Sequence, residues 1–185
     1  MKALLVMTVS VVFCGGCKEG AVGPGFIPVD RSAKDKLEEV NSLAESLGKT
    51  LRLVSVSSRD IRTDGTSDAW YYQYVDTSIP TISYWFHASL GAVAFDSTSP
   101  TGLGAAVITH FWFNSDRALS VAEENGGAQF RNQNVNCEIV GSVGEAVVPN
   151  AVTTWWITYR SKVDKSRTLL FGIDATSGAV TLKYP

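Results

Sequence analysis

The chain has 185 residues, of which 45% are hydrophobic and 18% are charged, so its composition is that of a globular protein and excludes a collagen, a coiled coil or a disordered tail. Its 16 lysine and arginine residues against 18 aspartate and glutamate residues give a net charge of −2, and the sequence offers no basic excess for nucleic acid. We therefore expect one large domain or two small ones and no nucleic-acid partner.

The first segment, residues 1–17, predicts export. A single positive charge precedes an apolar run over residues 3–13, which is too short for a permanent membrane span. Gly15 and Gly16 stand directly before Cys17, and this exit resembles the bacterial lipobox, in which the cysteine becomes the N-terminus and is diacylated. The resemblance implies a lipoprotein anchored to a membrane through Cys17 and facing the periplasm or the cell surface. Ordinary signal cleavage, which gives a soluble secreted protein, is the alternative.

Residues 18–29 are rich in glycine and proline and predict a tether between the anchor and the folded part. If Cys17 carries lipid, Cys137 is the one remaining thiol of the mature chain, so no intramolecular disulfide is possible. Cys137 lies in an alternating run that is typical of a strand, and a structural thiol is favoured over a nucleophile.

An amphipathic helix is expected next, with Asp30 or Ser32 as its cap and Gly48 as its end. Its apolar face consists of Leu37, Val40, Leu43, Ala44 and Leu47. Period-two patterns then predict strands near residues 51–56, 70–75, 82–88 and 92–95. The same order returns, with a helix near 115–125 and strands near 135–143, 154–159, 169–175 and 179–182.

Short sequence matches connect the two halves of the chain. They pair residues 44–48 with 122–126, 70–74 with 155–159, and 88–93 with 175–180. The offsets grow along the chain, as loop-length differences between two copies would make them do. The sequence thus predicts an α+β protein with two repeated units, over residues 30–100 and 101–185, each one helix packed on a roughly four-stranded antiparallel sheet.

The second unit resembles the PepSY and PepSY-like domains of exported bacterial proteins. The resemblance rests on Trp-Trp-Ile-Thr-Tyr at 155–159 and on Leu-Leu-Phe-Gly-Ile-Asp-Ala-Thr-Ser-Gly-Ala-Val at 169–180. The first unit departs from the pattern, because His87 stands where the second unit has Asp174. The resemblance implies a binding or inhibitory module without catalytic residues. A more distant likeness, in layout, is to the tandem β-lactamase-inhibitor proteins.

Strand alternation divides the side chains between two faces of the predicted sheets. One face is apolar in both units and is expected to pack on the helices. The other face carries the candidate binding surface, which consists of Tyr71, Gln73, Trp85, His87, Trp156 and Thr158. Large aromatic side chains on an outer face need a cover, and a partner would supply one. Alternatively, the two outer faces pack on each other or under residues 102–113.

Patterns for metal or nucleophilic catalysis are missing from the sequence. The two histidines, His87 and His110, lack zinc-ligand spacing, and His110 is expected in a half-buried strand. Leu-Gly-Lys-Thr at 47–50 fits a helix end better than a phosphate loop, and no Gly-x-Ser-x-Gly occurs. Three aspartates between residues 60 and 68 fit a solvated loop better than a calcium site. We expect neither a metal nor a cofactor.

These observations lead to two hypotheses. The first is an exported bacterial lipoprotein whose non-catalytic module binds or inhibits a protein or peptide partner in the cell envelope. The alternative is a small envelope hydrolase in which His87 works with a nearby carboxylate.

Overall fold

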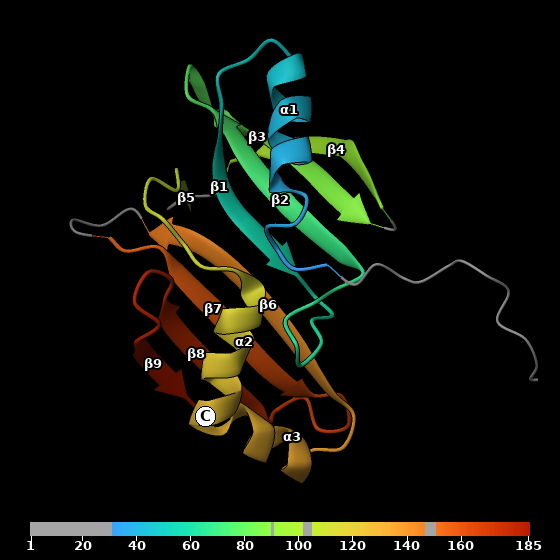
Figure 1. Cartoon of the computed structure of the whole chain (residues 1–185), viewed down its shortest axis with the longest axis vertical. Helices are drawn as coiled ribbons and strands as arrows, with labels where there is room; N and C mark the ends of the chain where they lie inside the picture. The colour runs from blue at the N-terminus through green and yellow to red at the C-terminus, as the bar shows by residue number, and fades with distance from the viewer. Residues whose placement is uncertain (1–30, 90, 102–104, 147–150) are drawn as a thin grey trace, which may run out of the picture.

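The computed structural model describes residues 31–89, 91–101, 105–146 and 151–185 (Figure 1). The predicted signal, Cys17 and the tether lie outside the described residues. The helices are α1 (Leu37–Ser46), α2 (Ser115–Ala122), the π-helical turn η1 (Glu123–Gly127) and α3 (Ala128–Gln133). The strands are β1 (Leu51–Ser58), β2 (Ala69–Asp76), β3 (Ile79–Ser89), β4 (Ala92–Pro100), β5 (Ala105–Ala106), β6 (Cys137–Ala146), β7 (Thr154–Ser161), β8 (Thr168–Asp174) and β9 (Val180–Tyr184).

Eight of these strands form one continuous antiparallel sheet in the order β4-β3-β2-β1-β6-β7-β8-β9, and β5 pairs with β6 beside it. The predicted fold of two repeated helix-on-sheet units is therefore wrong. The difference arises at β1 and β6, which pair with Val56 opposite Val143. Each of these strands would otherwise present a free edge, and their pairing satisfies the backbone groups of both.

Both helical segments cover the same face of this sheet (Figure 1). Val40 and Ala44 of α1 and Leu119 and Ala122 of α2 belong to a single buried apolar cluster. The cluster crosses the β1–β6 junction, where the rings of Trp70 and Trp155 meet edge to face with centroids 6.3 Å apart. Each helix packs on strands of its own half, α1 on β3 and β4 and α2 on β7 and β8, and one continuous core joins the two halves across the sheet.

The two buried indoles also fix the segments that lead into the helices. The indole N–H of Trp70 donates to the carbonyl oxygen of Arg31 at 2.7 Å, and that of Trp155 donates to the carbonyl oxygen of Phe113 at 2.9 Å. Such bonds satisfy the polar edge of an otherwise apolar ring, which must find a partner when it is buried. The chain before each helix is therefore tied to a central strand of the sheet.

The start of α1 differs from the prediction. The helix begins at Leu37 after Lys36, which makes no side-chain cap, whereas Ser32 lies in a preceding turn and its N–H donates to Asp35. Asp30, the other predicted cap, is outside the described residues. The helix ends before Gly48, which has φ +67°, a conformation that glycine adopts readily.

Candidate functional site

The face of the sheet opposite the helices carries the predicted binding residues. In a row across the strands, His87 lies opposite Tyr71, Tyr71 opposite Ser57, Ser57 opposite Ser142, and Ser142 opposite Trp156. Residues opposite each other in an antiparallel sheet point to the same side, so this row belongs to one face. Tyr71 and Trp156 are each 40% exposed. We call this surface the open face.

The middle of the open face is hollowed. A recess of about 600 Å³ lies over the β1–β6 junction and is lined by Ser57, Ser58, Arg59, Tyr71, Trp85, Val140, Gly141 and Ser142. Small residues form its floor, and two aromatic side chains stand on its β2–β3 side. Its volume is within the usual range for ligand sites. The predicted residues Tyr71 and Trp85 therefore border a cavity that exists only because the two halves share one sheet.

Trp156 lies beyond the recess, on β7, and its position depends on a glycine. A Cβ atom added at Gly172, its partner on β8, would stand 2.9 Å from Cζ3 of the Trp156 ring. The indole therefore rests over the backbone of β8 rather than pointing straight away from the sheet. Its outer surface forms an aromatic platform on the open face.

The other predicted residues of the surface have different roles. Gln73 accepts a hydrogen bond from Ser55 Oγ at 3.0 Å and donates one to Ser83 Oγ at 2.8 Å, so both ends of its amide are engaged within the sheet. The indole N–H of Trp85 donates to Ser99 Oγ at 2.8 Å. Thr158 is half-buried beside Leu170. Ser99 thus holds the Trp85 ring at the edge of the recess. The Gln73 amide is engaged within the sheet and offers no free group to a ligand.

His87 lies at the end of the row and is one-third exposed at its side chain. Its Nδ1 is 3.7 Å from Oδ1 of Asp96, and its ring centroid is 6.4 Å from that of Tyr71. Within the described residues, no serine, threonine or cysteine side chain is hydrogen-bonded to this imidazole. The Asp96 carboxylate at 3.7 Å is also beyond hydrogen-bond distance, so the described residues place neither a nucleophile nor an aspartate within the reach of His87 that the hydrolase alternative requires.

A second recess, of about 550 Å³, adjoins the first and shares Arg59 and Val140 with it. Glu138 and Arg160 line it and form an ion pair at 3.3 Å. Arg59 follows directly after β1 and is exposed, and it has no ion pair within the described part of the chain. It is also the one charged residue among the eight that line the first recess. The sequence contained no pattern that singled it out.

His110 lies elsewhere, and its predicted strand is wrong. The segment 107–113 has no strand, and the His110 side chain is 61% exposed with Nδ1 2.9 Å from Oε1 of Glu145. Glu145 also accepts hydrogen bonds from the backbone N–H groups of Thr109 and His110 and from the Thr153 hydroxyl. Burial alone would raise the pKa of Glu145, but these donors outweigh it and lower the pKa to about 2. The cluster anchors the connecting segment to β6.

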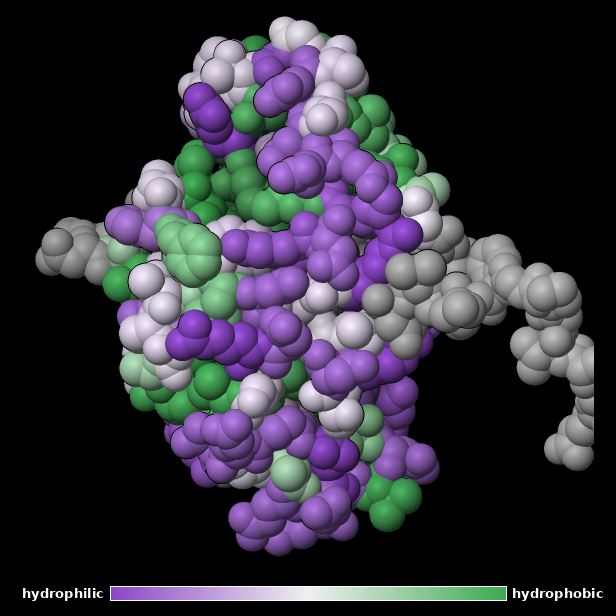
Figure 2. Space-filling model, viewed as in Figure 1, coloured by the Kyte–Doolittle hydropathy of each residue, from purple (hydrophilic) through white to green (hydrophobic). Residues whose placement is uncertain are grey.

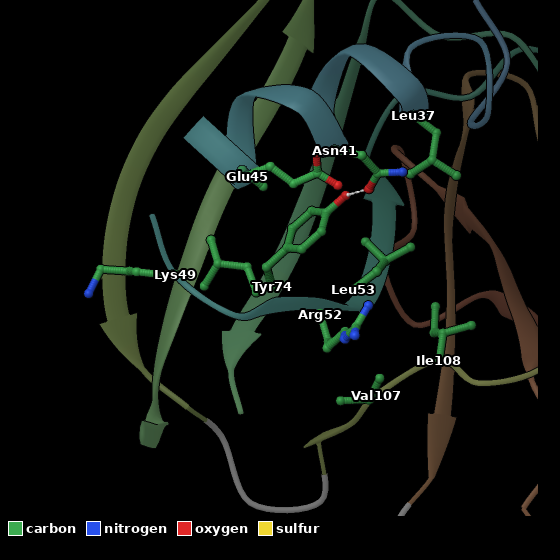
Figure 3. A pocket seen from close by; sticks show the side chains of 11 residues that line it. Leu37, Asn41, Glu45, Lys49, Arg52, Leu53, Tyr74, Val107 and Ile108 are labelled. Atoms are coloured by element: carbon green, nitrogen blue, oxygen red, sulfur yellow. Dashed lines mark hydrogen bonds between the residues drawn. The ribbon is translucent and has the colours of Figure 1, made fainter. Parts of the chain in front are cut away.

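The helix-bearing face contains a smaller cavity of about 270 Å³ between α1, β1 and residues 107–108. Figure 2 shows hydrophobic side chains in a hollow of this face, among polar side chains. In Figure 3, Tyr74 points to Asn41, whose amide oxygen accepts its hydroxyl hydrogen bond at 2.5 Å, and Glu45 lies beside them. Burial raises the pKa of Tyr74, so its hydroxyl stays a donor. The cavity is below the usual volume of ligand sites.

Cys137 is half-buried at the start of β6, and burial raises the pKa of its thiol. A protonated thiol is a poor nucleophile, which fits a structural role. Nowhere in the described ranges do three or more histidine, cysteine, aspartate or glutamate side chains gather closely enough to hold a metal ion. The helices described by the structure are too short or too polar to cross a membrane.

Comparison of the chain with protein-family models, with curated proteins and with solved structures gives no significant match. The resemblance of residues 155–180 to PepSY-like domains therefore stays a prediction.

Proposed function

We propose that this protein is a non-catalytic binding module that holds a protein or peptide partner on its open face. The observation that carries the proposal is the recess over the β1–β6 junction, which is bordered by Tyr71 and Trp85 and followed by the platform of Trp156. Aromatic side chains dominate binding energy at interfaces because they bury a large area at a small entropic cost. Each such anchor contributes about 2 kcal/mol or more when a partner buries it fully.

The working location of the module is the cell envelope. The support is the sequence of residues 1–17, which resembles a lipoprotein signal ending at Cys17, and the glycine- and proline-rich stretch that follows. A lipid anchor restricts the protein to a membrane surface, where the local concentration of a membrane-associated partner is high. Under this proposal, moderate affinity at the open face is sufficient for stable association.

The proposal is tested by affinity isolation from the native envelope with three forms of the full chain. They are the wild type, a Tyr71→Ser/Trp156→Ser variant of the open face, and a Phe111→Ser variant. Phe111 is a suitable control because it is 68% exposed and lies outside the open face, next to Lys34 and Trp112. We expect one partner to be recovered with the wild type and the control and lost with the open-face variant. Equal recovery with all three forms would contradict the proposal.

A further inference from the structure

The open face also indicates what kind of segment occupies its recess. We infer that the recess binds an extended, proline-containing peptide in the polyproline II conformation, with an acidic group beside Arg59. This inference rests on the proposed function and specifies the partner's chemistry. It follows from three properties of the surface, which are its saturated backbone, its free hydroxyl groups and its flat aromatic rings.

The first property excludes a peptide that binds by extending the sheet. β1 pairs with both β2 and β6, and β6 pairs with both β1 and β7. The backbone N–H and C=O groups beneath the recess are therefore already used in the ladder. A peptide that lies across this floor has to meet side chains, because β-strand addition needs an unpaired edge.

The second property concerns the hydroxyl groups of Ser57 and Ser142, which sit opposite each other at the centre of the floor. Neither hydroxyl has a hydrogen-bond partner in the part of the chain that the structure describes. An apolar helix face laid over them would bury both without partners, at a cost of about 1–3 kcal/mol each. An extended segment, in contrast, brings carbonyl oxygens that accept hydrogen bonds from these hydroxyls.

The third property concerns the aromatic rings, whose arrangement suits a polyproline II segment. Such a segment has no internal hydrogen bonds and leaves its carbonyl groups available, while its proline rings are apolar and flat-sided. Proline-rich segments bind aromatic-lined grooves in this way. Trp156 rests over Gly172 with its outer surface exposed, and Tyr71 stands on the opposite side of the floor.

The register sets the length of the segment. Tyr71 and Trp156 are three strand spacings apart in one row, and at about 4.8 Å per spacing this is about 14 Å. Polyproline II rises about 3.1 Å per residue, so a segment of about five residues spans the two rings. Arg59, the one charged residue among the described lining residues, follows Ser57 by two residues just after the end of β1, between the two rings, and pairs with an acidic side chain in the middle of the segment.

The test uses the full chain and synthetic peptides, observed through the indole N–H signals of its tryptophans in NMR titrations. The probe is Pro-Pro-Glu-Pro-Pro. The comparison peptides carry lysine for the glutamate, glycine and serine for the prolines, or only the two prolines that flank the glutamate. We expect the probe to shift the Trp156 signal and to bind on the order of tenfold more tightly than each comparison peptide, a difference of about 1.4 kcal/mol.

Variants assign the contacts. Trp156→Ala is expected to weaken probe binding on the order of tenfold, while Trp156→Phe retains most of it and Phe111→Ala leaves it unchanged. Arg59→Ala should remove the preference for glutamate over lysine without affecting the remaining affinity. The inference would be overturned if the glycine-serine peptide bound as tightly as the probe, or if the indole signals did not move at millimolar probe. Binding of a chitin oligosaccharide in place of the probe would also overturn it. If the open-face variant still loses its envelope partner in that case, the proposed function stands and only the peptide chemistry is wrong.

Discussion

Replacing Glu145 by glutamine removes the carboxylate that holds residues 109–110 against β6. The side chain of Glu145 is 6% exposed, and its donors include two backbone N–H groups and the Thr153 hydroxyl at 2.7 Å. These donors lower its pKa from the ordinary value of 4.5 to about 2. A difference of this size between the unfolded and folded states corresponds to about 3 kcal/mol of stability at neutral pH.

The sign of the effect fixes its pH dependence. Because the folded-state pKa is lowered, the stabilisation is present in full above about pH 5 and is lost as the pH falls toward 2. Glu145→Gln should therefore lower the free energy of unfolding by about 3 kcal/mol at pH 7 and by less than half of that at pH 3. Urea unfolding followed by tryptophan fluorescence measures both values.

The matched control is Glu38→Gln, since Glu38 is an exposed residue of α1 and should change stability little at either pH. An equal loss at pH 7 and pH 3 for Glu145→Gln would show that the carboxylate acts through its shape and not through its charge. No loss at pH 7 would refute the assigned hydrogen bonds altogether.

Three further predictions concern stability and location. Gly127→Ala should lower the free energy of unfolding by about 1–3 kcal/mol in a denaturant titration, because the new Cβ would stand 2.4 Å from the buried Tyr159 hydroxyl. An unchanged unfolding midpoint would contradict this contact. Gly91→Val should lower the free energy of unfolding by about 1–2 kcal/mol in thermal melts, because Gly91 has φ +93°. Ala92→Val, on an ordinary strand backbone, should be nearly neutral, and equal melting temperatures of the two variants would contradict backbone strain at Gly91. Cys17→Ser should move the protein from the membrane to the soluble fraction, and unchanged fractionation would refute the lipid anchor.

Local patterns in the sequence located most helices and strands within a few residues. Hydrophobic positions recur with period 3.6 in α1 and with period 2 in β2, β3, β7 and β8, and these periods follow from backbone geometry alone. The junction of β1 and β6 could not be predicted in this way. The paired residues of β1 and β6 are 80 or more positions apart in the sequence, so their pairing depends on which strand edges meet once the helices have packed. The local pattern of one sequence does not specify this long-range pairing.

The same limitation explains what was missed at the candidate site. Tyr71, Trp85 and Trp156 could be assigned to an outer face because aromatic residues stand out within alternating strands. Ser57, Ser142 and Arg59 are ordinary surface residues in sequence, and only the β1–β6 pairing turns them into one recess. Serine at alternate positions 55 and 57 was the one available signal, because small polar residues that alternate with buried ones mark a strand with an uncovered face.

The prediction for His110 failed for a different reason. Val107 and Ile108 precede Thr109 and His110, and three aromatic residues follow, which favoured a strand. In the structure, Glu145 binds the backbone of residues 109–110, and the segment bends there instead of joining the sheet. A single distant carboxylate outweighs the local propensity, as tertiary contacts commonly do for short segments.

Partner binding at the open face is tested most directly with a photo-crosslinking amino acid on each face of the sheet in the native envelope. One variant carries it in place of Tyr71 on the open face, and the other carries it in place of Ser42, an exposed residue of α1 on the helix-bearing face. Binding at the open face should give one discrete adduct from position 71, abolished by Trp156→Ser in the same chain, and none from position 42. The same adduct from position 42, or an adduct from position 71 that survives Trp156→Ser, would contradict binding at the open face.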